Sequence, residues 1–281
     1  MGIILNMDNI KSSADAYKKN QETYNHASDE IWQRVVYDNI HGGYEFANIS
    51  GTSILDKLNK VVNLSRKSLL DIGCGSGDGS IYLAENFDCN VCGVDSNHLQ
   101  ILNAQNKVNQ RNSPLTERVN FRVNDFSNTL ANLEQYDVAI SVDSFSLLVD
   151  LDRALLNLSQ VLKLDGKFII ADVFGGPNVD QSILDFAWQE DGMVNLSSAE
   201  IFCEKVQQSS QMRITEREDK TDLAKVVFTK ILNAATKLIS DPECNIPNRT
   251  ITGWVELAEI YLDAFDTYKL TYFWICGQRI A

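Results

Sequence analysis

The sequence contains no long apolar run. Among its 281 residues no segment approaches the roughly 18 consecutive apolar residues that cross a bilayer. The apolar N-terminal stretch is too short for a signal peptide, and Asn6 stands where a myristoylation signal needs serine or threonine. We therefore expect a cytoplasmic protein without a membrane span. The sequence also shows no internal repeat, low-complexity run or coiled coil.

Cysteines are few and scattered. The six lie at positions 74, 89, 92, 203, 244 and 276. Cys89 and Cys92 have the spacing of metal ligands, but no second pair accompanies them, so the sequence predicts no metal site. Reduced cysteines in a cytosolic protein are the simpler explanation.

Basic residues form no dense cluster, and the formal net charge is -13. Since a protein that grips phosphates needs a basic surface, a nucleic-acid substrate is excluded. A small or cationic acceptor is more compatible with this charge. A chain of 281 residues that is 44% hydrophobic can bury a full core as one large domain with an added cap. A homodimer is the assembly to test.

One glycine-rich stretch organises the chain. Residues 69–79 read Leu-Leu-Asp-Ile-Gly-Cys-Gly-Ser-Gly-Asp-Gly, an apolar run that enters a cluster of glycines before a helix. Glycines suit a turn that needs positive φ and a backbone that approaches a ligand closely. An ordinary strand-to-helix turn is the simpler alternative. Asp78 occupies the third glycine position of the dinucleotide fingerprint, which disfavours a nicotinamide cofactor.

Apolar strands and helices alternate from residue 68 to residue 174, a pattern typical of a parallel sheet covered on both faces. We predict an α/β fold: a Rossmann-like, seven-stranded, mainly parallel sheet with helices on both faces. Residues 1–67 are expected to form an N-terminal helical arm or lid, and residues 68–281 the Rossmann-like domain. A helical cap is expected at about 174–210, its second helix starting at the capping box of Ser197 and Glu200. The strands after the glycine turn are predicted at 90–94, 119–123, 136–142, 167–173, 212–216 and 270–276, and the main helices at 29–37, 54–62, 97–111, 150–163, 221–239 and 253–265.

Acidic residues end several predicted strands. In open parallel sheets ligands bind beyond the carboxyl ends of the strands. Asp95, twenty residues beyond Gly75, can take both hydroxyls of a ribose. The carboxylate of Asp125 could accept a hydrogen bond from an adenine amino group while Phe126 covers the ring. The acids at 71, 95, 125, 143 and 172 are all expected at this edge.

Taken together, these motifs resemble the class I S-adenosylmethionine-dependent methyltransferases. The match rests on an acid-x-Gly-x-Gly-x-Gly pattern from Asp71 to Gly77, on Gly93-Val-Asp95 and on Asn124-Asp-Phe126. Flanking segments at 38–46, 195–198 and 218–221 look like the branch that methylates small molecules, such as phosphoethanolamine, sarcosine, tocopherol and natural products. The sequence departs from the phosphoethanolamine type at Leu147, where that type has a histidine.

The resemblance implies transfer of a methyl group from S-adenosylmethionine to a small acceptor by oxygen, nitrogen or carbon methylation, leaving S-adenosylhomocysteine. His41, Tyr44 and Tyr24 are the catalytic candidates, because an imidazole or phenol can remove a proton from the acceptor. The implied cofactor-binding residues are Asp71, Gly73, Cys74, Gly75, Gly77, Asp95, Ser96, Asn97, Asn124, Asp125, Phe126 and Val142.

Two other functions remain open at this point. The chain could be a nicotinamide-dependent oxidoreductase, against which Asp78 counts. It could also be a non-catalytic nucleoside-binding subunit that keeps the cofactor site and lacks turnover.

Overall fold

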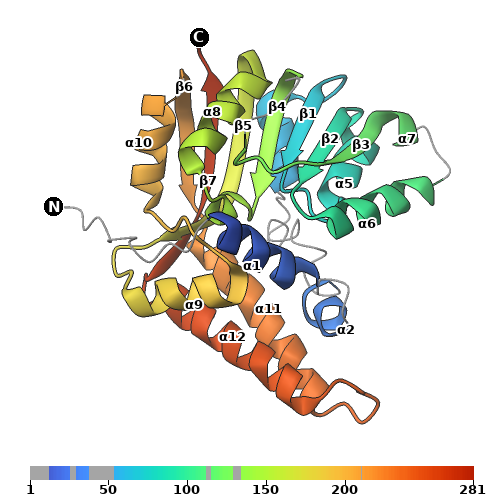
Figure 1. Ribbon diagram of the computed structural model, residues 1–281, viewed down its shortest axis with the longest axis vertical. Coiled ribbons are helices and arrows are strands. Elements are labelled where there is room, and N and C mark those ends of the chain that lie inside the picture. Colours follow the sequence, from blue (N-terminus) through green and yellow to red (C-terminus); the bar gives the residue numbers. More distant parts are fainter. Residues whose placement is uncertain (1–12, 26–29, 38–53, 112–114, 129–133, 210) are drawn as a thin grey trace.

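The computed structural model describes residues 13–25, 30–37, 54–111, 115–128, 134–209 and 211–281 (Figure 1). Its strands are β1 (Ser68–Ile72), β2 (Asn90–Asp95), β3 (Val119–Val123), β4 (Tyr136–Val142), β5 (Leu162–Gly175), β6 (Met212–Asp219) and β7 (Leu270–Arg279). Its helices are α1 (Ser13–Asn25), α2 (Glu30–Trp32), the π-helix η2 (Gln33–Tyr37), α4 (Ile54–Val62), α5 (Asp78–Phe87), α6 (His98–Asn109), α7 (Leu115–Arg118), the 3-10 turn η4 (Phe145–Leu147), α8 (Leu151–Val161), α9 (Gln181–Asp191), α10 (Ala199–Ser209), α11 (Thr221–Ile239) and α12 (Asn248–Asp266).

The seven strands form one sheet in the order β3-β2-β1-β4-β5-β7-β6. Strands β1 to β5 pair in parallel, and β7 runs antiparallel between β5 and β6. The predicted Rossmann-like, seven-stranded, mainly parallel sheet with helices on both faces is confirmed. The order reverses between β1 and β4, and such a switch point places a ligand crevice at the carboxyl ends of these strands.

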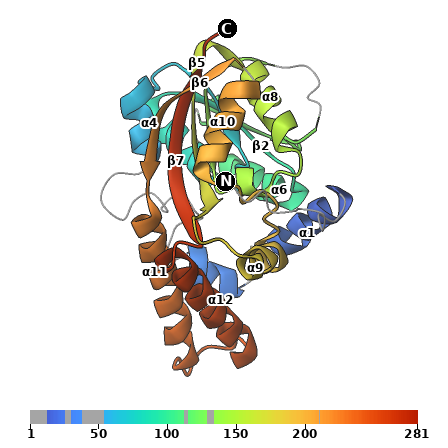
Figure 2. The same ribbon diagram turned by 90° about the vertical axis from the view of Figure 1, so that its left-hand side faces the viewer.

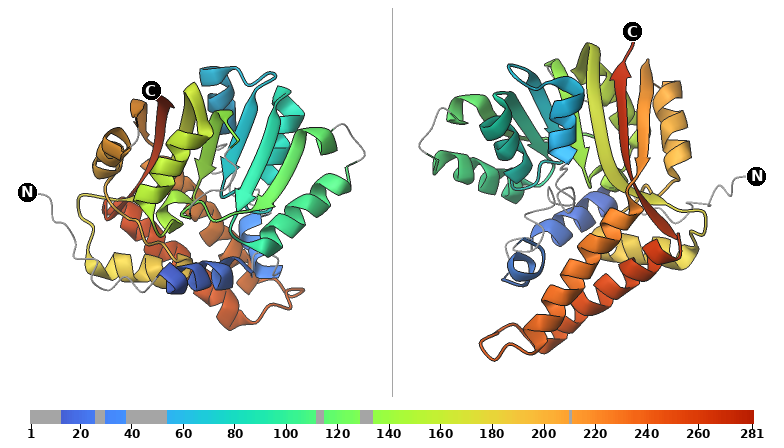
Figure 3. Two further views of the ribbon diagram at one scale, coloured as in Figure 1. Left: turned by 45° about the horizontal axis from the view of Figure 1, so that its top comes forward. Right: turned by 180° about the vertical axis from the view of Figure 1, so that it is seen from behind.

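Alternating strand residues feed two separate cores, one on each face of the sheet. Leu69 of β1 packs with α4, α5 and α6, whereas its neighbour Leu70 packs with α8 and α10 on the other face. Successive side chains of a strand point to opposite faces, so both faces of the central strands are apolar and buried. Figure 3 shows these helices flanking the sheet on its two sides.

A second group of helices lies beyond the carboxyl edge of the sheet. Figures 1 and 2 show α1, α9, α11 and α12 below that edge, with α11 and α12 projecting as an antiparallel pair. Of the two helices in segment 174–210, α9 joins this group, while α10 packs against α8 and β6. The cap over the edge is therefore built from α9 together with helices from both ends of the chain.

Several boundaries differ from those predicted. α10 starts two residues after Ser197, and the Oγ of Ser198 accepts the hydrogen bond from the backbone N of Ile201 at 3.3 Å. α12 begins directly after Pro247, whose fixed φ suits a helix start. β5 starts earlier than expected, since Asp165 adopts φ 63° and the chain bulges there without leaving the sheet. Among the described residues, no helix is both long and apolar enough to cross a lipid bilayer.

Candidate active site

A cavity of about 710 Å³ lies at the carboxyl ends of β1, β2 and β4. Its sheet side carries the glycine turn and all five strand-end acids predicted for this edge. Its other side is formed by α1, α11 and α12, which supply among others Tyr24, Phe228 and Trp254. The cavity therefore lies between the sheet edge and the cap helices.

The glycine turn wraps around the end of β2. The backbone N–H groups of Gly73 and Cys74 both donate to the carbonyl of Val94, at 2.8 and 3.0 Å. Gly73, Gly75 and Gly77 have φ of 73°, 52° and 82°, a region that L side chains rarely adopt.

The three glycines serve different purposes. A Cβ on Gly73 would meet the Oγ of Ser144 at 2.1 Å, whereas a Cβ on Gly75 would have no atom within 4 Å. Gly77 does not line the cavity, and its Cβ would collide with the ring of Phe121. Gly73 and Gly77 thus allow close packing, and Gly75 leaves open space on the cavity side of the turn.

Asp95 is fixed between the turn and α6. One carboxylate oxygen accepts a hydrogen bond from the N–H of Gly75 at 2.9 Å, and the other accepts one from the N–H of Asn97 at 2.8 Å. Burial raises the pKa of Asp95, and the two backbone bonds partly oppose this rise. Each oxygen has further lone pairs, so this carboxylate can still accept hydroxyl donors from a ligand.

Asp71 lies beneath the turn at the end of β1. Its carboxylate accepts a hydrogen bond from the Oγ of Ser80 at 2.6 Å. Burial nevertheless raises its pKa to about 6, and the nearby charge of Asp95 contributes to this rise. The pKa of Cys74, also on the cavity, is raised well above its usual value by burial, so this thiol is a weak nucleophile.

The predicted adenine-binding loop also lines the cavity. The Oδ1 atom of Asn124 is buried and accepts no hydrogen bond from any described residue. Asp125 accepts bonds from the N of Ser127 and the Nδ2 of Asn128, both at 2.9 Å, and Phe126 is buried. A buried acceptor without a partner is costly, so Asn124 is suited to a donor from a ligand.

Ser96 and Asn97 follow β2 and meet α1. The Oδ1 of Asn97 caps α6 by accepting from the N–H groups of Leu99 and Gln100, at 2.9 and 3.2 Å. Its Nδ2 donates to the Oδ1 of Asn25 at 3.0 Å, and the hydroxyl of Tyr17 lies 3.4 Å from the carbonyl of Ser96. Both residues line the cavity, and Asn97 also holds α1 against it.

A group of acids faces the cap side of the cavity. Asp143 has φ 53° and accepts a hydrogen bond from the hydroxyl of Tyr272 at 2.9 Å. Asp172 accepts from the N–H groups of Ser144 and Ser146, both at 3.1 Å. Burial and mutual repulsion raise the pKa of Asp143 well above its usual value, and burial raises that of Asp172.

Asp191, at the end of α9, was not predicted from the sequence. It accepts a hydrogen bond from the hydroxyl of Tyr261, and burial raises its pKa to about 6. The aromatic lining from α11 and α12 was also missed. Helical periodicity predicts these two helices but not that they turn a face to the ligand edge.

Of the catalytic candidates, Tyr24 lies on the cavity, while His41 and Tyr44 lie outside the described residues. Burial and the charges of Asp191, Asp143, Asp172 and Asp95 raise the pKa of Tyr24 well above its usual value. Its phenol is therefore a hydrogen-bond donor at neutral pH.

Val142 lines the cavity as predicted, and among the described residues no group of three His, Cys, Asp or Glu side chains could hold a metal ion.

Comparison with known proteins decides the family. Residues 63–235 match a family described as a methyltransferase domain, which covers more than half of the chain. This chain belongs to that methyltransferase family. The glycine turn and the acids of β1, β2 and β4 all fall within the matched residues.

The methyltransferase resembles several curated proteins. It is 25% identical over 167 residues to methyltransferase GfsG of Streptomyces halstedii, covering 57% of this chain and 59% of that protein. It is 27% identical over 185 residues to phosphoethanolamine N-methyltransferase 1 of Arabidopsis thaliana, covering 58% of this chain and 37% of that protein. The matches thus span less than two thirds of these relatives' length.

Solved structures show the same fold. The cyclopropane synthase MmaA2 of Mycobacterium tuberculosis superposes with a TM-score of 0.78 at 15% identity, over 93% of this chain and 98% of that one. A phosphoethanolamine N-methyltransferase 2 of Haemonchus contortus superposes with a TM-score of 0.77 at 19% identity, over 97% of this chain and 61% of that one.

Proposed function

We propose that this chain is an S-adenosylmethionine-dependent methyltransferase that acts on a small-molecule acceptor. The observation that carries the proposal is the pairing of the open Gly75 turn with the Asp95 carboxylate on one wall of the cavity at the sheet edge. Family membership adds support, and the Haemonchus neighbour was solved with S-adenosylhomocysteine.

The residues present fit this cofactor. Asp95 would hold the ribose hydroxyls, the buried Oδ1 of Asn124 would accept a donor from the adenine end, and the space beside Gly75 would admit the amino-acid end. Asp71 and Ser80 would stay beneath the turn and support it. When bound, the cofactor supplies a sulfonium methyl group: the acceptor's lone pair bonds to the methyl carbon as the carbon–sulfur bond breaks, and its electrons remain on sulfur.

The chain's own residues provide enclosure and proton transfer. The cap helices and the sheet edge exclude water and hold the acceptor at close range, from which much of the rate can come. Tyr24 would orient the acceptor as a donor, and His41 and Tyr44 remain candidates for proton removal. Replacing His41 with Ala should lower turnover more than cofactor affinity if it is the base.

The expected acceptor is a specialised metabolite, as in natural-product biosynthesis. A cytoplasmic location fits the six cysteines, none of which forms a disulfide. A homodimer is proposed as the assembly, and light scattering coupled to size exclusion tests it against a monomer of 31.5 kDa.

Calorimetry with S-adenosylhomocysteine tests the proposed cofactor. The wild-type protein should bind S-adenosylhomocysteine with a dissociation constant in the high micromolar range or below. Asp95→Ala should weaken binding by about 1 to 3 kcal/mol, because charge-assisted hydrogen bonds are lost. Asp152→Ala, which removes an equal charge at an exposed site, should leave the affinity unchanged. Fluorescence enhancement of NADH with no S-adenosylhomocysteine binding would favour the oxidoreductase instead.

A further inference from the structure

The geometry points to an acceptor that carries a protonated amine and no phosphate, held by Asp143 and Asp172 of the sheet edge, Asp191 of α9 and the aromatic rings of α11 and α12. This inference rests on the proposed function and specifies its substrate class. Three independent features of the described cavity lining lead to it: acids without a Lys or Arg partner, a single basic side chain that is already paired, and several aromatic rings.

Three acids of the cavity have no cationic partner among the residues that the structure describes. Asp143, Asp172 and Asp191 line one cavity, and among the described residues none has a Lys or Arg nitrogen within 4.0 Å. Their hydrogen bonds come from phenols and backbone N–H groups. Lys19 on α1 lowers the pKa of Asp191 from a distance without forming an ion pair among the described contacts. Buried carboxylates that repel one another are stabilised by a cation, so a positive ligand would complete this wall.

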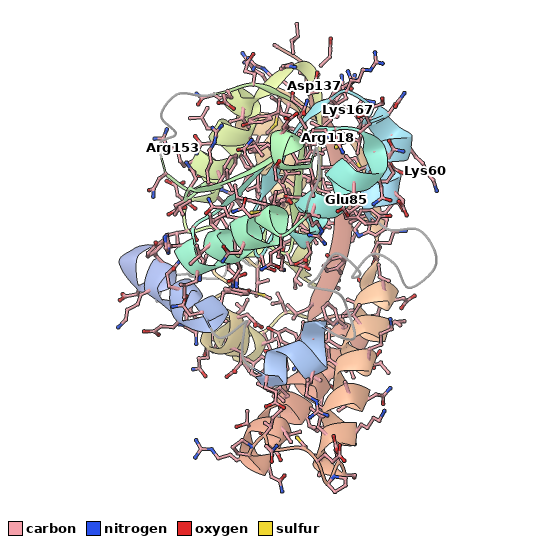
Figure 4. All side chains as sticks on the ribbon, turned by 90° about the vertical axis from the view of Figure 1, so that its right-hand side faces the viewer. Lys60, Glu85, Arg118, Asp137, Arg153 and Lys167 are labelled. Atoms are coloured by element: carbon pink, nitrogen blue, oxygen red, sulfur yellow. The ribbon has the colours of Figure 1, made fainter. Side chains whose placement is uncertain are left out.

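Asp137, in contrast to the acids of the cavity, is paired with a lysine. It lies at the opposite end of the sheet, near Lys167 in Figure 4, and pairs with the Nζ of Lys163 at 3.0 Å. Ser68 also donates to it, and its pKa falls to about 2. The chain therefore does pair acids with lysines, both at this end of the sheet and, through Lys107 and Asp78, beside the glycine turn, but it does not do so at Asp143, Asp172 and Asp191 among the described residues.

The cavity offers little for a phosphate. Lys107 is the single basic side chain among its described lining residues, and it lies near the glycine turn. Its Nζ is already bonded to Asp78 at 2.6 Å and to Ser76 at 2.9 Å. Outside the described residues, the sequence contains one lysine, Lys11, and no arginine. Arg and Lys are the usual side-chain donors to phosphate, and none among the described lining residues is left for a phosphorylated acceptor, whose charge would add to that of the acids.

Aromatic rings line the same cavity as these acids. Tyr261 stacks on Phe228 with ring centroids 4.7 Å apart, and Trp254 lines the same side. Aromatic faces attract cations, most strongly when water is excluded. The buried Nε2 of Gln21 on the α1 wall has no partner among the described residues, so it could serve a polar group elsewhere on the acceptor.

For an amine acceptor, Asp143 would take the proton in place of His41 or Tyr44. An ammonium nitrogen must release one proton before its lone pair can form the new bond to the methyl carbon. The Asp143 carboxylate lines the cavity and is held by Tyr272, while its backbone N–H bonds to the carbonyl of Ala171 at 2.8 Å. The proton would pass to this carboxylate and from there to solvent on product release.

Calorimetry with matched probes tests the inference, with and without saturating S-adenosylhomocysteine. The probes are phenethylamine, 2-phenylethanol, 3-phenylpropanoate and phosphoethanolamine. The first three are similar in size and carry a cationic, a neutral and an anionic group, and phosphoethanolamine combines the amine with a phosphate. Phenethylamine should bind at least tenfold more tightly than the alcohol, and the two anionic probes more weakly still. Asn tolerates positive φ, so Asp143→Asn should fold and lose at least tenfold in phenethylamine affinity. Asp152→Asn is the control of equal charge.

Tighter binding of the alcohol or of either anionic probe would overturn the inference, as would phenethylamine binding that Asp143→Asn leaves unchanged. Normal S-adenosylhomocysteine binding without amine selectivity would defeat this inference alone. A failure to bind S-adenosylhomocysteine would defeat the proposed function, and titration of phenethylamine into the ligand-free protein would still decide the charge preference of the wall.

Discussion

Single residues at the strand ends carry most of the chemistry, and the sequence places them well. Acids that follow apolar strands of a parallel sheet must meet at one edge, so positions 71, 95, 125, 143 and 172 could be predicted. Asp191 could not, because its place depends on how α9 packs against Tyr261, 70 residues away in sequence. The role of Gly77 was also beyond prediction, since only the structure shows Phe121 beside it.

Asp71 should make stability depend on pH. Its folded pKa of about 6 lies above the usual 3.8, so the folded protein binds this proton more tightly than the unfolded chain. The contribution to the free energy of unfolding is therefore full below the unfolded pKa and is lost as pH rises through about 6. The expected loss is about 3 kcal/mol.

Urea unfolding between pH 4 and 7 measures this effect. Asp71→Asn keeps an acceptor for Ser80 and should flatten the pH dependence relative to the wild type. Asp152→Asn should leave it unchanged, because that side chain is exposed. Identical pH slopes for wild type and Asp71→Asn would contradict the assignment.

The glycines of the turn should differ in their tolerance to alanine. Gly73→Ala combines a positive φ with a Cβ 2.1 Å from the Oγ of Ser144, whereas Gly75→Ala has the positive φ alone. We expect a loss of about 1 to 2 kcal/mol for Gly75→Ala and a further loss of about 1 to 3 kcal/mol for Gly73→Ala.

Thermal or urea unfolding of both variants tests this difference. The double variant Gly73→Ala/Ser144→Gly should recover the additional loss, because the colliding side chain is gone. Equal destabilisation by the two single variants would show that the contact with Ser144 is unimportant. Gly75→Ala should in addition weaken S-adenosylhomocysteine binding, since its methyl group would lie on the cavity side.

At the scale of elements, the sheet and the helices on its faces were predictable because their patterns are local. Period-two and buried apolar runs predict the strands, and the stripe of Leu151, Leu155 and Leu158 predicts α8. The cap was less predictable. Segment 174–210 contains the two predicted helices, α9 and α10, but only α9 lies over the sheet edge, because α10 packs beside the sheet. The rest of the cap includes α11 and α12, which reach beyond the edge. Nothing in their periodicity distinguishes these placements.

The junction between α1 and α6 depends on Asn97. Its Oδ1 caps α6, and its Nδ2 bonds to Asn25 of α1. Asn97→Ala should lower the free energy of unfolding by about 1 kcal/mol through loss of the cap. Asn97→Asp keeps the capping oxygen and loses the bond to α1; its added charge lies at the start of α6, where the helix dipole offsets repulsion from Asp95, so it should retain most of this stability in urea unfolding.

Hydrogen exchange separates the two roles of Asn97. Asn97→Asp should leave exchange in α6 unchanged and raise it in α1. Equal protection of α1 in the wild type and in Asn97→Asp would mean that Gln100 and Tyr17 suffice to hold this helix.

At the scale of the whole molecule, the fold separates two charge environments. Asp137 at the amino end of the sheet is paired with Lys163, while the cavity at the carboxyl end is lined by acids and aromatic rings, with Lys107 as the one basic side chain among its described lining residues. The net charge of -13 is compatible with a small or cationic acceptor, but the net charge alone does not show where such an acceptor would bind. The location follows from tertiary packing, which brings α9, α11 and α12 to one side of the cavity.

The central claim is that the glycine turn and Asp95 form the binding site of S-adenosylmethionine. A crystal structure of the protein with S-adenosylhomocysteine tests it most directly. The account predicts density in the cavity with both ribose hydroxyls hydrogen-bonded to Asp95 and the adenine beside Asn124 and Phe126. Density at another place, or bulky side chains filling the cavity so that no adenosine fits, would contradict it.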